Sequence, residues 1–518
     1  MISLILVMVC AIAAGWLANR IRIPYPIILV LAGIGLGFVY DWPGLDPEPQ
    51  LVLAIVLPAV LYPAALSTSW RDFRSQLRPI LLLAIGLVAT TTLAVGIALK
   101  WLVPQTPWAV AFALGAIVSP PDAVAATAVL RRFRLPRRIV TLLEGESLVN
   151  DATGLVLYRF AVATALTGLF SGWSLVGQFA LIAVGGIVLG LAMGWITARL
   201  QERLHDTMLE LALSLTTPFA TYWICESLQV SGVLGIVTVG LYRARWAHRR
   251  SSAVARLNIL TFWRAAVFVV NCLVFILIGI HLPVIFNSLL DHQALSWQRV
   301  VGLIAVLSAV AIGVRFLWIF TATYGVRLLI PSLRRTDPAS ARVSTIVSWC
   351  GMRGVVTLAA ALALPTVLPS GEPFPQRDLV ILLAFGIVAV TLVGQGLTLP
   401  PLIKAMQLEK DTSEDTETEL AQEAMRTAAI KAVNRIVAEH GLPVHEAVSI
   451  KRFFNSKAAQ RSGSGLSLDD ETRLWLGAAA AQRDALLKLW QSGEIGDDVL
   501  ARLERQIDLA EARLARDE

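Results

Sequence analysis

Residues 115–125 read GAIVSPPDAVA, so that two prolines and an acidic residue interrupt an otherwise apolar segment. A proline has no N–H to donate to a helical hydrogen bond, and its ring collides with the preceding turn. We therefore expect a helix break near Pro120 and Pro121. Within a bilayer, non-helical backbone is tolerated only where it is buried in protein or lines a water-filled cavity. This stretch predicts a broken membrane helix that lines an internal site.

The composition of the whole chain also indicates a membrane protein. Its 518 residues are 56% hydrophobic and 16% charged, with a mean hydropathy of +0.67, which is too apolar for a soluble protein of two or three domains. A bilayer core of roughly 30 Å requires about 20 apolar residues per helix. We assign thirteen apolar segments, at residues 2–18, 24–40, 51–66, 79–103, 107–130, 141–168, 174–199, 206–226, 231–242, 259–282, 298–326, 343–366 and 379–405. Because the ninth segment is short, twelve spans are the alternative.

Basic residues fall in alternate loops between these segments, which accounts for the formal net charge of +7 without a nucleic-acid site. One set of loops contains Arg20, Arg22, Arg71, Arg74, Arg78, Arg131, Arg132, Arg134, Arg137, Arg138, Arg199, Arg203, Arg243, Arg245, Arg249, Arg250, Arg327, Arg334, Arg335 and Arg342. The other set has only Lys100, Arg299 and Arg377. Since lysine and arginine collect in cytoplasmic loops, this alternation favours thirteen spans, with the N-terminus outside and the C-terminus in the cytoplasm.

A polar, charged tail follows the last apolar segment. We therefore expect a transmembrane domain at residues 1–405 and a helical cytosolic tail at residues 406–518. Apolar residues of an amphipathic helix recur in the tail every three or four positions, at Val499, Leu503, Ile507, Ala510 and Leu514. This face can pack on the tail itself, on a second protomer or on the membrane domain. The four cysteines have no metal-ligand spacing, and we expect no cofactor.

The sixth segment contains a second polar stretch, EGESLVNDATG at residues 144–154. An ionisable residue inside a span costs roughly 2.5 kcal/mol or more, so this stretch must line the protein interior. At helical spacing, Ser147 and Asp151 share one face, and Glu146 and Asn150 form a neighbouring row. The hydroxyl and carboxylate of the first row offer oxygen ligands to a small hard cation. Burial also favours the protonated form of a carboxylate, so Asp151 can carry a proton instead. A purely structural role for Asp151 is the alternative.

The twelfth segment reads WCGMRGVVT at residues 349–357 and places an arginine between two glycines inside the membrane. Small residues permit close approach of another helix, and a buried arginine requires a counter-ion. We expect Glu146 to pair with Arg353. Segments five and twelve, the two interrupted ones, are seven spans apart and so run in opposite directions. This arrangement is typical of two inverted repeats with crossing broken helices and a midplane site.

Three motifs carry a family resemblance: PPDAVA at 120–125, GESLVND at 145–151 and GMRG at 351–354. Over roughly residues 1–405 the chain resembles the monovalent cation/proton antiporters of the sodium/proton exchanger type, bacterial branch. The resemblance implies that Asp151 binds either cation or proton, with Ser147 and the backbone near Pro121 as further ligands. It also implies that Asn150 steadies the helix crossing and that Glu146 and Arg353 form an ion pair. Asp122 corresponds to the family's acid in segment five, but Pro121 replaces the usual preceding threonine.

The same resemblance implies a mechanism. Spans 4–6 and 11–13 would form a moving core, and spans 1–3 and 8–10 a scaffold that forms a homodimer in a bacterial inner membrane. Asn150 before Asp151 implies electroneutral exchange of one cation for one proton, with roles in pH and sodium homeostasis. Many relatives have a glutamate where this chain has Pro63, so Li+ or K+ remain alternative cations to Na+.

Three other functions are alternatives to Na+/H+ exchange. The nearest is a K+/H+ or broad monovalent cation/H+ exchanger on the same scaffold. A cation channel is disfavoured, because channels use glycine-rich carbonyl filters or rings of charged residues from symmetric subunits. An intramembrane enzyme is also disfavoured, because no serine–histidine arrangement and no zinc-binding histidine motif is present.

Overall fold

The computed structural model describes residues 2–21, 25–39, 49–123, 126–127, 130, 133–168, 172–204, 206–250, 253–291, 296–325, 340–408, 413–442 and 468–514. Within these ranges the regular structure is helical, apart from one isolated bridge between Val367 and Pro373. The expected all-α class is therefore confirmed. The helices up to Met406 include α1 (Ile2–Ile21), α2 (Tyr25–Val39), α3 (Pro49–Ser67), α4 (Trp70–Ser75), α5 (Leu77–Leu81), α6 (Val88–Leu102), α7 (Trp108–Val118), α9 (Arg137–Thr167), α10 (Gly172–Gln201), α11 (Thr207–Ser227), α12 (Gly232–Arg250), α13 (Ala253–Asp291), α14 (Trp297–Phe320), α17 (Ala341–Trp349), α18 (Val355–Leu362), α19 (Arg377–Ala389) and α20 (Gly396–Met406). Three π-helical stretches join or extend them: η1 (Leu82–Leu87), η2 (Thr321–Gly325) and η3 (Val390–Gln395).

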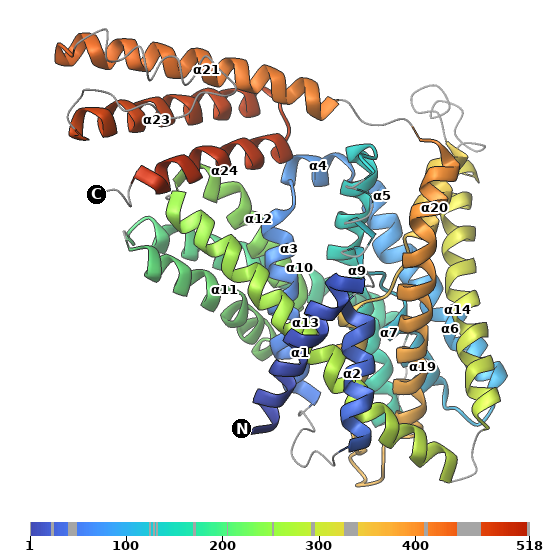
Figure 1. Cartoon of the computed structure of the whole chain (residues 1–518). Coiled ribbons are helices and arrows are strands. Elements are labelled where there is room, and N and C mark those ends of the chain that lie inside the picture. The colour runs from blue at the N-terminus through green and yellow to red at the C-terminus, as the bar shows by residue number, and fades with distance from the viewer. Residues whose placement is uncertain are drawn as a thin grey trace. The chain divides into compact units, whose positions relative to one another are not determined.

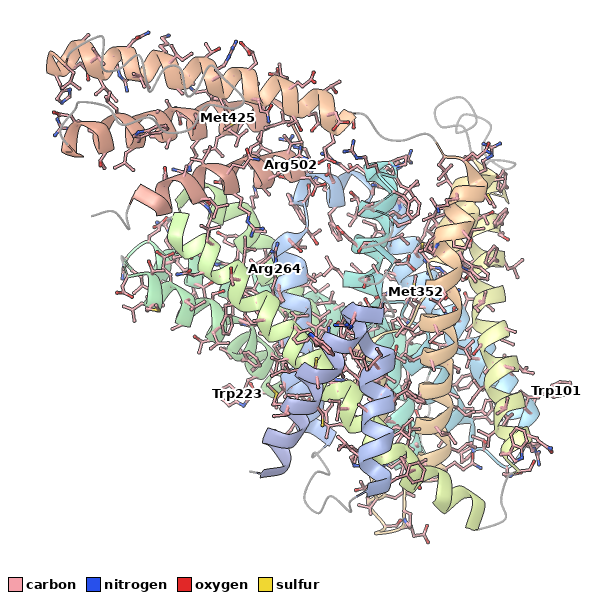
Figure 2. The ribbon with its side chains drawn as sticks, in the orientation of Figure 1. Trp101, Trp223, Arg264, Met352, Met425 and Arg502 are labelled. Atoms are coloured by element: carbon pink, nitrogen blue, oxygen red, sulfur yellow. The ribbon has the colours of Figure 1, made fainter. Side chains whose placement is uncertain are left out.

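Five stretches of the described helices are long and apolar enough to cross a bilayer: Leu77–Leu102, Gly177–Gln201, Ala255–Pro283, Trp297–Gly325 and Arg377–Met406. Shorter apolar helices include Ile28–Phe38, Leu51–Ser67 and Trp108–Val118. The number of thirteen spans and the inverted repeats therefore stay predictions. Large apolar side chains cover outward-facing positions: Trp101 and Trp223 are 82% and 71% exposed and project away from the helices that carry them (Figure 2). Such exposure is expected where lipid is the solvent.

Both helix interruptions expected from the sequence are present. Helix α7 ends at Val118, residues 119–122 are not helical, and Ala123 is helical again. Helix α17 ends at Trp349, residues 350–354 are not helical, and α18 begins at Val355. The prolines explain the first break. In the second, which contains no proline, the extended backbone of Gly354 (φ −134°, ψ −151°) precedes the first turn of α18.

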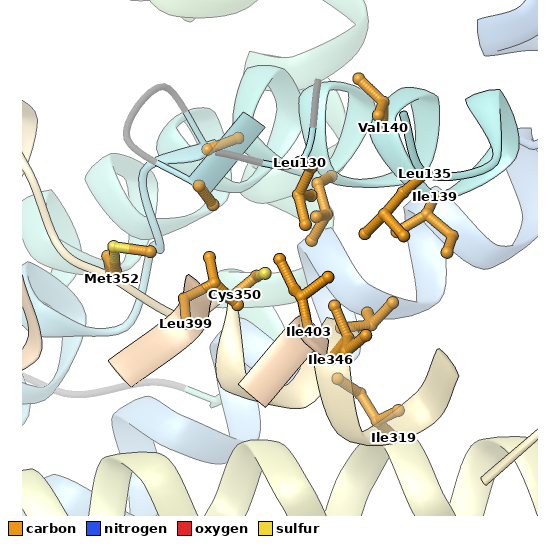
Figure 3. Close-up of a cluster of buried hydrophobic side chains, with 14 of the residues drawn as sticks. Leu130, Leu135, Ile139, Val140, Ile319, Ile346, Cys350, Met352, Leu399 and Ile403 are labelled. Carbon is orange, nitrogen blue, oxygen red and sulfur yellow. The ribbon is translucent and has the colours of Figure 1, made fainter. Parts of the chain in front are cut away.

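Helix α7 packs against both α6 and α9 (Figure 1). Gly115 permits this contact with α6, because a Cβ there would lie 2.3 Å from the Thr92 carbonyl oxygen. Beside the breaks lies an apolar cluster to which both interrupted segments contribute. Cys350 and Met352 of the second break lie near Leu399 of α20, and Ile139 of α9 belongs to the same cluster (Figure 3). The two breaks are thus held in a packed interior.

The tail helices α21 (Ser413–His440), α23 (Leu468–Ser492) and α24 (Asp497–Leu514) belong to a second compact unit, which also includes Asp206–Leu211 and Arg249–Thr261. The expected apolar face of α24 is buried at Val499, Leu503 and Ile507, which cluster with residues of α21 and α23 such as Met425 and Leu486. Ala510 is exposed, and the Leu514 side chain lies outside the described residues. The sequence allowed three partners for this apolar face, and the structure shows that other helices of the tail are one of them.

Candidate functional site

The expected site residues of the sixth segment lie on one continuous helix, α9, which packs directly on the first helix break. Gly154 makes this possible, since a Cβ at that position would lie 2.4 Å from Cγ of Pro120. One polar stretch of α9 is therefore brought against the non-helical residues 119–122. Asn150 and Asp151 are buried within this contact, with 0% and 6% of their surface exposed.

Two side chains of α9 bind the backbone on either side of Asp122. The fully buried Asn150 donates from Nδ2 to the carbonyl oxygen of Pro121 at 2.9 Å. Ser147 accepts at Oγ from the amide of Ala123 at 3.3 Å. The Asn150 bond is the contact that a steadying role at the crossing requires. The amide oxygen Oδ1 of Asn150 is buried and accepts no hydrogen bond within the described structure.

Asp151 lies on α9 directly after Asn150 and one turn beyond Ser147. Within the described part of the chain its carboxylate makes no ion pair with a lysine, arginine or histidine. A buried carboxylate without a positive partner is strongly disfavoured in its charged form, and it is stabilised by binding a proton or a cation. The Ser147 hydroxyl and Asn150 amide oxygen of the same stretch of α9, and the Pro121 carbonyl that Asn150 contacts, are oxygen atoms of the kind that hard cations accept as ligands. No three His, Cys, Asp or Glu side chains gather as a metal site among the described residues.

The two helix breaks contact each other. The amide of Asp122 donates to the carbonyl of Met352 at 2.6 Å. The Asp122 carboxylate lies against Gly354 so closely that a Cβ there would be 1.9 Å from Oδ2. Across the second break, the amide of Arg353 donates to Thr391 Oγ1 at 3.3 Å. Each break is therefore held by a polar side chain of a helix that follows it in the chain, Asn150 of α9 for the first and Thr391 of η3 for the second.

The expected ion pair between Glu146 and Arg353 is wrong. Glu146 pairs instead with Arg315 of α14, in a two-pronged contact with Nη1–Oε1 and Nη2–Oε2 distances of 2.5 and 2.8 Å. The Arg315 and Glu146 side chains are almost fully buried, with 3% and 1% of their surfaces exposed. Arg315 also donates from Nε to the Val347 carbonyl at 3.2 Å, which ties α14 to α17.

Arg353 is buried as expected, but its guanidinium binds backbone. Nε donates to the carbonyl oxygen of Val118, the last residue of α7 before the first break, at 3.0 Å, and Nη1 donates to the carbonyl oxygen of Gly351 at 2.6 Å. The physical reason is that broken helices leave carbonyl groups without intrahelical donors, and an arginine fork can satisfy them. The polar motifs give no sign of Arg315, which stands in an otherwise apolar part of the chain. The same insertion cost applied to segment 298–326 would have identified it.

Comparison with known proteins supplies independent information about this arrangement. A family model described as "sodium/hydrogen exchanger, transmembrane" matches residues 5–405. An uncharacterized Na+/H+ exchanger of Mycobacterium tuberculosis is 32% identical over 522 residues, covering 98% of this chain and 95% of that protein. A sodium, potassium, lithium and rubidium/H+ antiporter of Bacillus subtilis is 30% identical over 516 residues, covering 97% of this chain and 77% of that protein.

Among solved structures, the sodium proton antiporter MjNhaP1 from Methanocaldococcus jannaschii is similar in fold. The TM-score is 0.63 at 18% sequence identity, and the alignment covers 79% of this chain and 99% of that one. At this identity the likeness concerns the arrangement of helices and leaves the roles of individual side chains to be argued from their contacts.

Proposed function

The chain belongs to the sodium/hydrogen exchanger family of membrane antiporters, and we propose that it exchanges one monovalent cation for one proton at Asp151. The observation that carries the proposal is the environment of this carboxylate. It is buried on α9 against the first helix break, beside several oxygen ligands and without a positive side-chain partner among the described residues.

Competition for a single carboxylate can couple the two fluxes. A charged, empty Asp151 is costly to carry through the low-dielectric part of the protein, whereas a protonated or cation-bound Asp151 is not. The helices around the breaks then cross between inward- and outward-facing states only when the site is occupied. Ser147, the Pro121 carbonyl and the Asn150 amide oxygen are the proposed further ligands of the cation, and Asp122 contributes negative charge nearby.

Asn150 is the reason to propose electroneutral exchange. A neutral amide precedes Asp151 where a second carboxylate would add another titrating charge, so one proton leaves for each cation bound. An imposed voltage across proteoliposomes should then leave the exchange rate unchanged. A rate that rises or falls clearly with voltage would contradict this stoichiometry.

Na+ is the proposed cation, with K+ and Li+ as alternatives. The B. subtilis relative is described as an antiporter of four alkali cations, and the M. tuberculosis relative as a Na+/H+ exchanger. Pro63, inside α3, removes one carboxylate that could have favoured a particular ion. Dye-monitored exchange with chloride salts of Li+, Na+, K+ and Rb+ tests this choice. Similar exchange rates with all four salts would contradict a preference for Na+ and indicate a broad specificity for alkali cations.

The proposal also includes a moving core and a scaffold, and a homodimer. It places the protein in a bacterial inner membrane, with the N-terminus outside and the C-terminus in the cytoplasm. Packing of α6, α7, α9, α14, α17 and α19 around the two breaks supports a moving core.

The exchange itself is tested in inverted membrane vesicles with an acid interior, to which Na+ is added. Competition requires that lowering the external pH raises the apparent KM for Na+ while the rate at saturating Na+ changes little. An apparent KM that does not depend on pH would contradict a shared site.

A further inference from the structure

An ion pair joins α9 to α11 on one side of the proposed site. Arg159 follows Asp151 by two helical turns, roughly 12 Å along the axis and away from the Arg137 end of α9. Its Nη2 lies 2.6 Å from Oε1 of Glu226, in the last turn of α11. The two side chains are 41% and 30% exposed, so the pair is only partly covered by protein.

Glu226 belongs to a block formed by α10, α11 and α12. The turn after α11 is closed by a hydrogen bond from the Gln229 amide to the Glu226 carbonyl at 3.0 Å, and the Ser231 amide donates to Ile182 of α10 at 3.1 Å. Glycines allow the helices of this block to touch. A Cβ at Gly190 of α10 would lie 2.6 Å from the carbonyl oxygen of Gly235 in α12. Glu226 is therefore fixed to this block.

Arg159 belongs to a different block. The backbone of α9 packs against α7, with further contacts to α5, η1 and α6. Gly145 and Gly154 place α9 in direct contact with Ile80 of α5 and with Pro120 of the first break. The Arg159–Glu226 pair therefore connects the helices that hold the proposed site to the helices of the α10–α12 block.

The strength of the pair suits a contact that forms and breaks. A partly exposed ion pair gains little, because water and salt screen it and two long side chains must be ordered. The Glu146–Arg315 pair differs in kind, since removing either partner would leave a buried charge. A buried pair holds helices together permanently, whereas a half-exposed pair can open when the blocks move.

We propose that Arg159 and Glu226 form a latch that closes α9 against α11 on one side of Asp151 and opens in the opposite-facing state. The inference rests on the proposed alternating access at Asp151, because a latch has a function only if the two blocks move. Its residues bind neither cation nor proton in the transport reaction. Their contribution is to set the balance between the two states.

Reversible cross-linking tests the latch. In a variant without the four native cysteines, Arg159→Cys and Glu226→Cys are joined by a bifunctional methanethiosulfonate reagent. We expect Na+/H+ exchange in vesicles to be lost and to return when the link is reduced. The same cross-link between Gln201→Cys and Arg243→Cys, which join α10 to α12 inside one block, should leave exchange intact. Exchange by the cross-linked Arg159–Glu226 protein at the rate of the uncross-linked protein would overturn the latch.

Charge variants provide the test if the cysteine variant folds poorly. Glu226→Gln and Arg159→Gln should each change the apparent KM for Na+ by roughly two- to fivefold, as expected from losing an exposed ion pair. The swapped variant Arg159→Glu with Glu226→Arg should restore the wild-type value. An unchanged apparent KM for Na+ in both single variants would refute the proposal. A swapped variant whose KM is no closer to the wild-type value than that of the single variants would refute it too.

A third measurement separates the latch from the site. Na+ added to purified, cross-linked protein should still release protons, because binding at Asp151 does not require the blocks to move. Loss of exchange with retained proton release supports the latch. Loss of both would mean that the cross-link distorts the binding site, and it would count against a purely conformational role.

Discussion

At the scale of single residues, Glu146 and Asp151 show how surroundings assign roles to two acids on one helix. Glu146 is bound by both arms of the Arg315 guanidinium, which makes it one half of a buried ion pair. Asp151 has no such partner among the described residues, and the proposed role of exchanging its charge follows from that difference. Both acids are buried, so burial alone does not distinguish them.

Arg315→Leu should destabilise the protein strongly. It would leave the Glu146 carboxylate buried without its positive partner, a loss of about 3–5 kcal/mol for a broken buried pair. Thermal unfolding of the purified protein in detergent measures the change. The double variant Arg315→Leu with Glu146→Gln serves as the control, and it should recover most of the stability because no unpaired charge remains. If Arg315→Leu unfolds at the same temperature as the wild type, the ion pair does not stabilise the fold.

At the scale of elements, the two breaks differ in how far the sequence predicts them. Pro120 and Pro121 dictate the first break locally. The second was expected from an arginine between glycines, and its actual cause includes contacts from distant parts of the chain. Asp122 lies against Gly354, and the Arg353 amide is bound by Thr391. Asp122 and Gly354 are more than 200 positions apart in the chain. No local sequence pattern predicts contacts of this kind.

Gly354→Ala should reduce exchange and stability together. The added methyl group would lie 1.9 Å from Asp122 Oδ2, so either the carboxylate or the break must shift. Overpacking of this kind costs roughly 1–3 kcal/mol. Gly394→Ala in η3 is the matched control, since a Cβ there meets no atom within 4 Å. Vesicle exchange and thermal unfolding of both variants measure the effect. Equal exchange rates and equal unfolding temperatures for the two variants would show that the contact between the two breaks is not required.

The second compact unit contains a buried charge cluster. Arg256 at the start of α13 contacts Glu504 and Asp508 of α24, and Arg483 of α23 binds Asp508 and Glu511. The side chains of Glu504 and Asp508 are only 4% exposed. The cluster therefore ties α24 both to α23 and to the first turns of α13.

Arg256→Ala should loosen α24, because two buried carboxylates would lose a shared partner. Limited proteolysis measures this as faster cleavage within the tail. Arg435→Ala is the control, since Arg435 pairs with Glu439 at an exposed site, where such pairs contribute little. Equal cleavage rates for the two variants would mean that the cluster does not hold α24 in place.

At the scale of the whole molecule, the sequence predicts the helical class, the two breaks and the polar face of α9. These depend on hydropathy, proline sterics and helical spacing, which are local properties. It does not predict which arginine meets Glu146, because that choice depends on where the assembled fold places Arg315 of α14. The error at Arg353 has the same origin, since the carbonyls that bind it become available only when both breaks are assembled.

If cation and proton compete for Asp151, binding of a cation must displace a proton from the purified protein. Na+ is added to weakly buffered, purified protein, and the pH change is recorded for the wild type and for Asp151→Asn. We expect the wild type to release protons as Na+ saturates the site, and Asp151→Asn, shown to be folded by thermal unfolding, to release none. Proton release by Asp151→Asn equal to that of the wild type would contradict this competition.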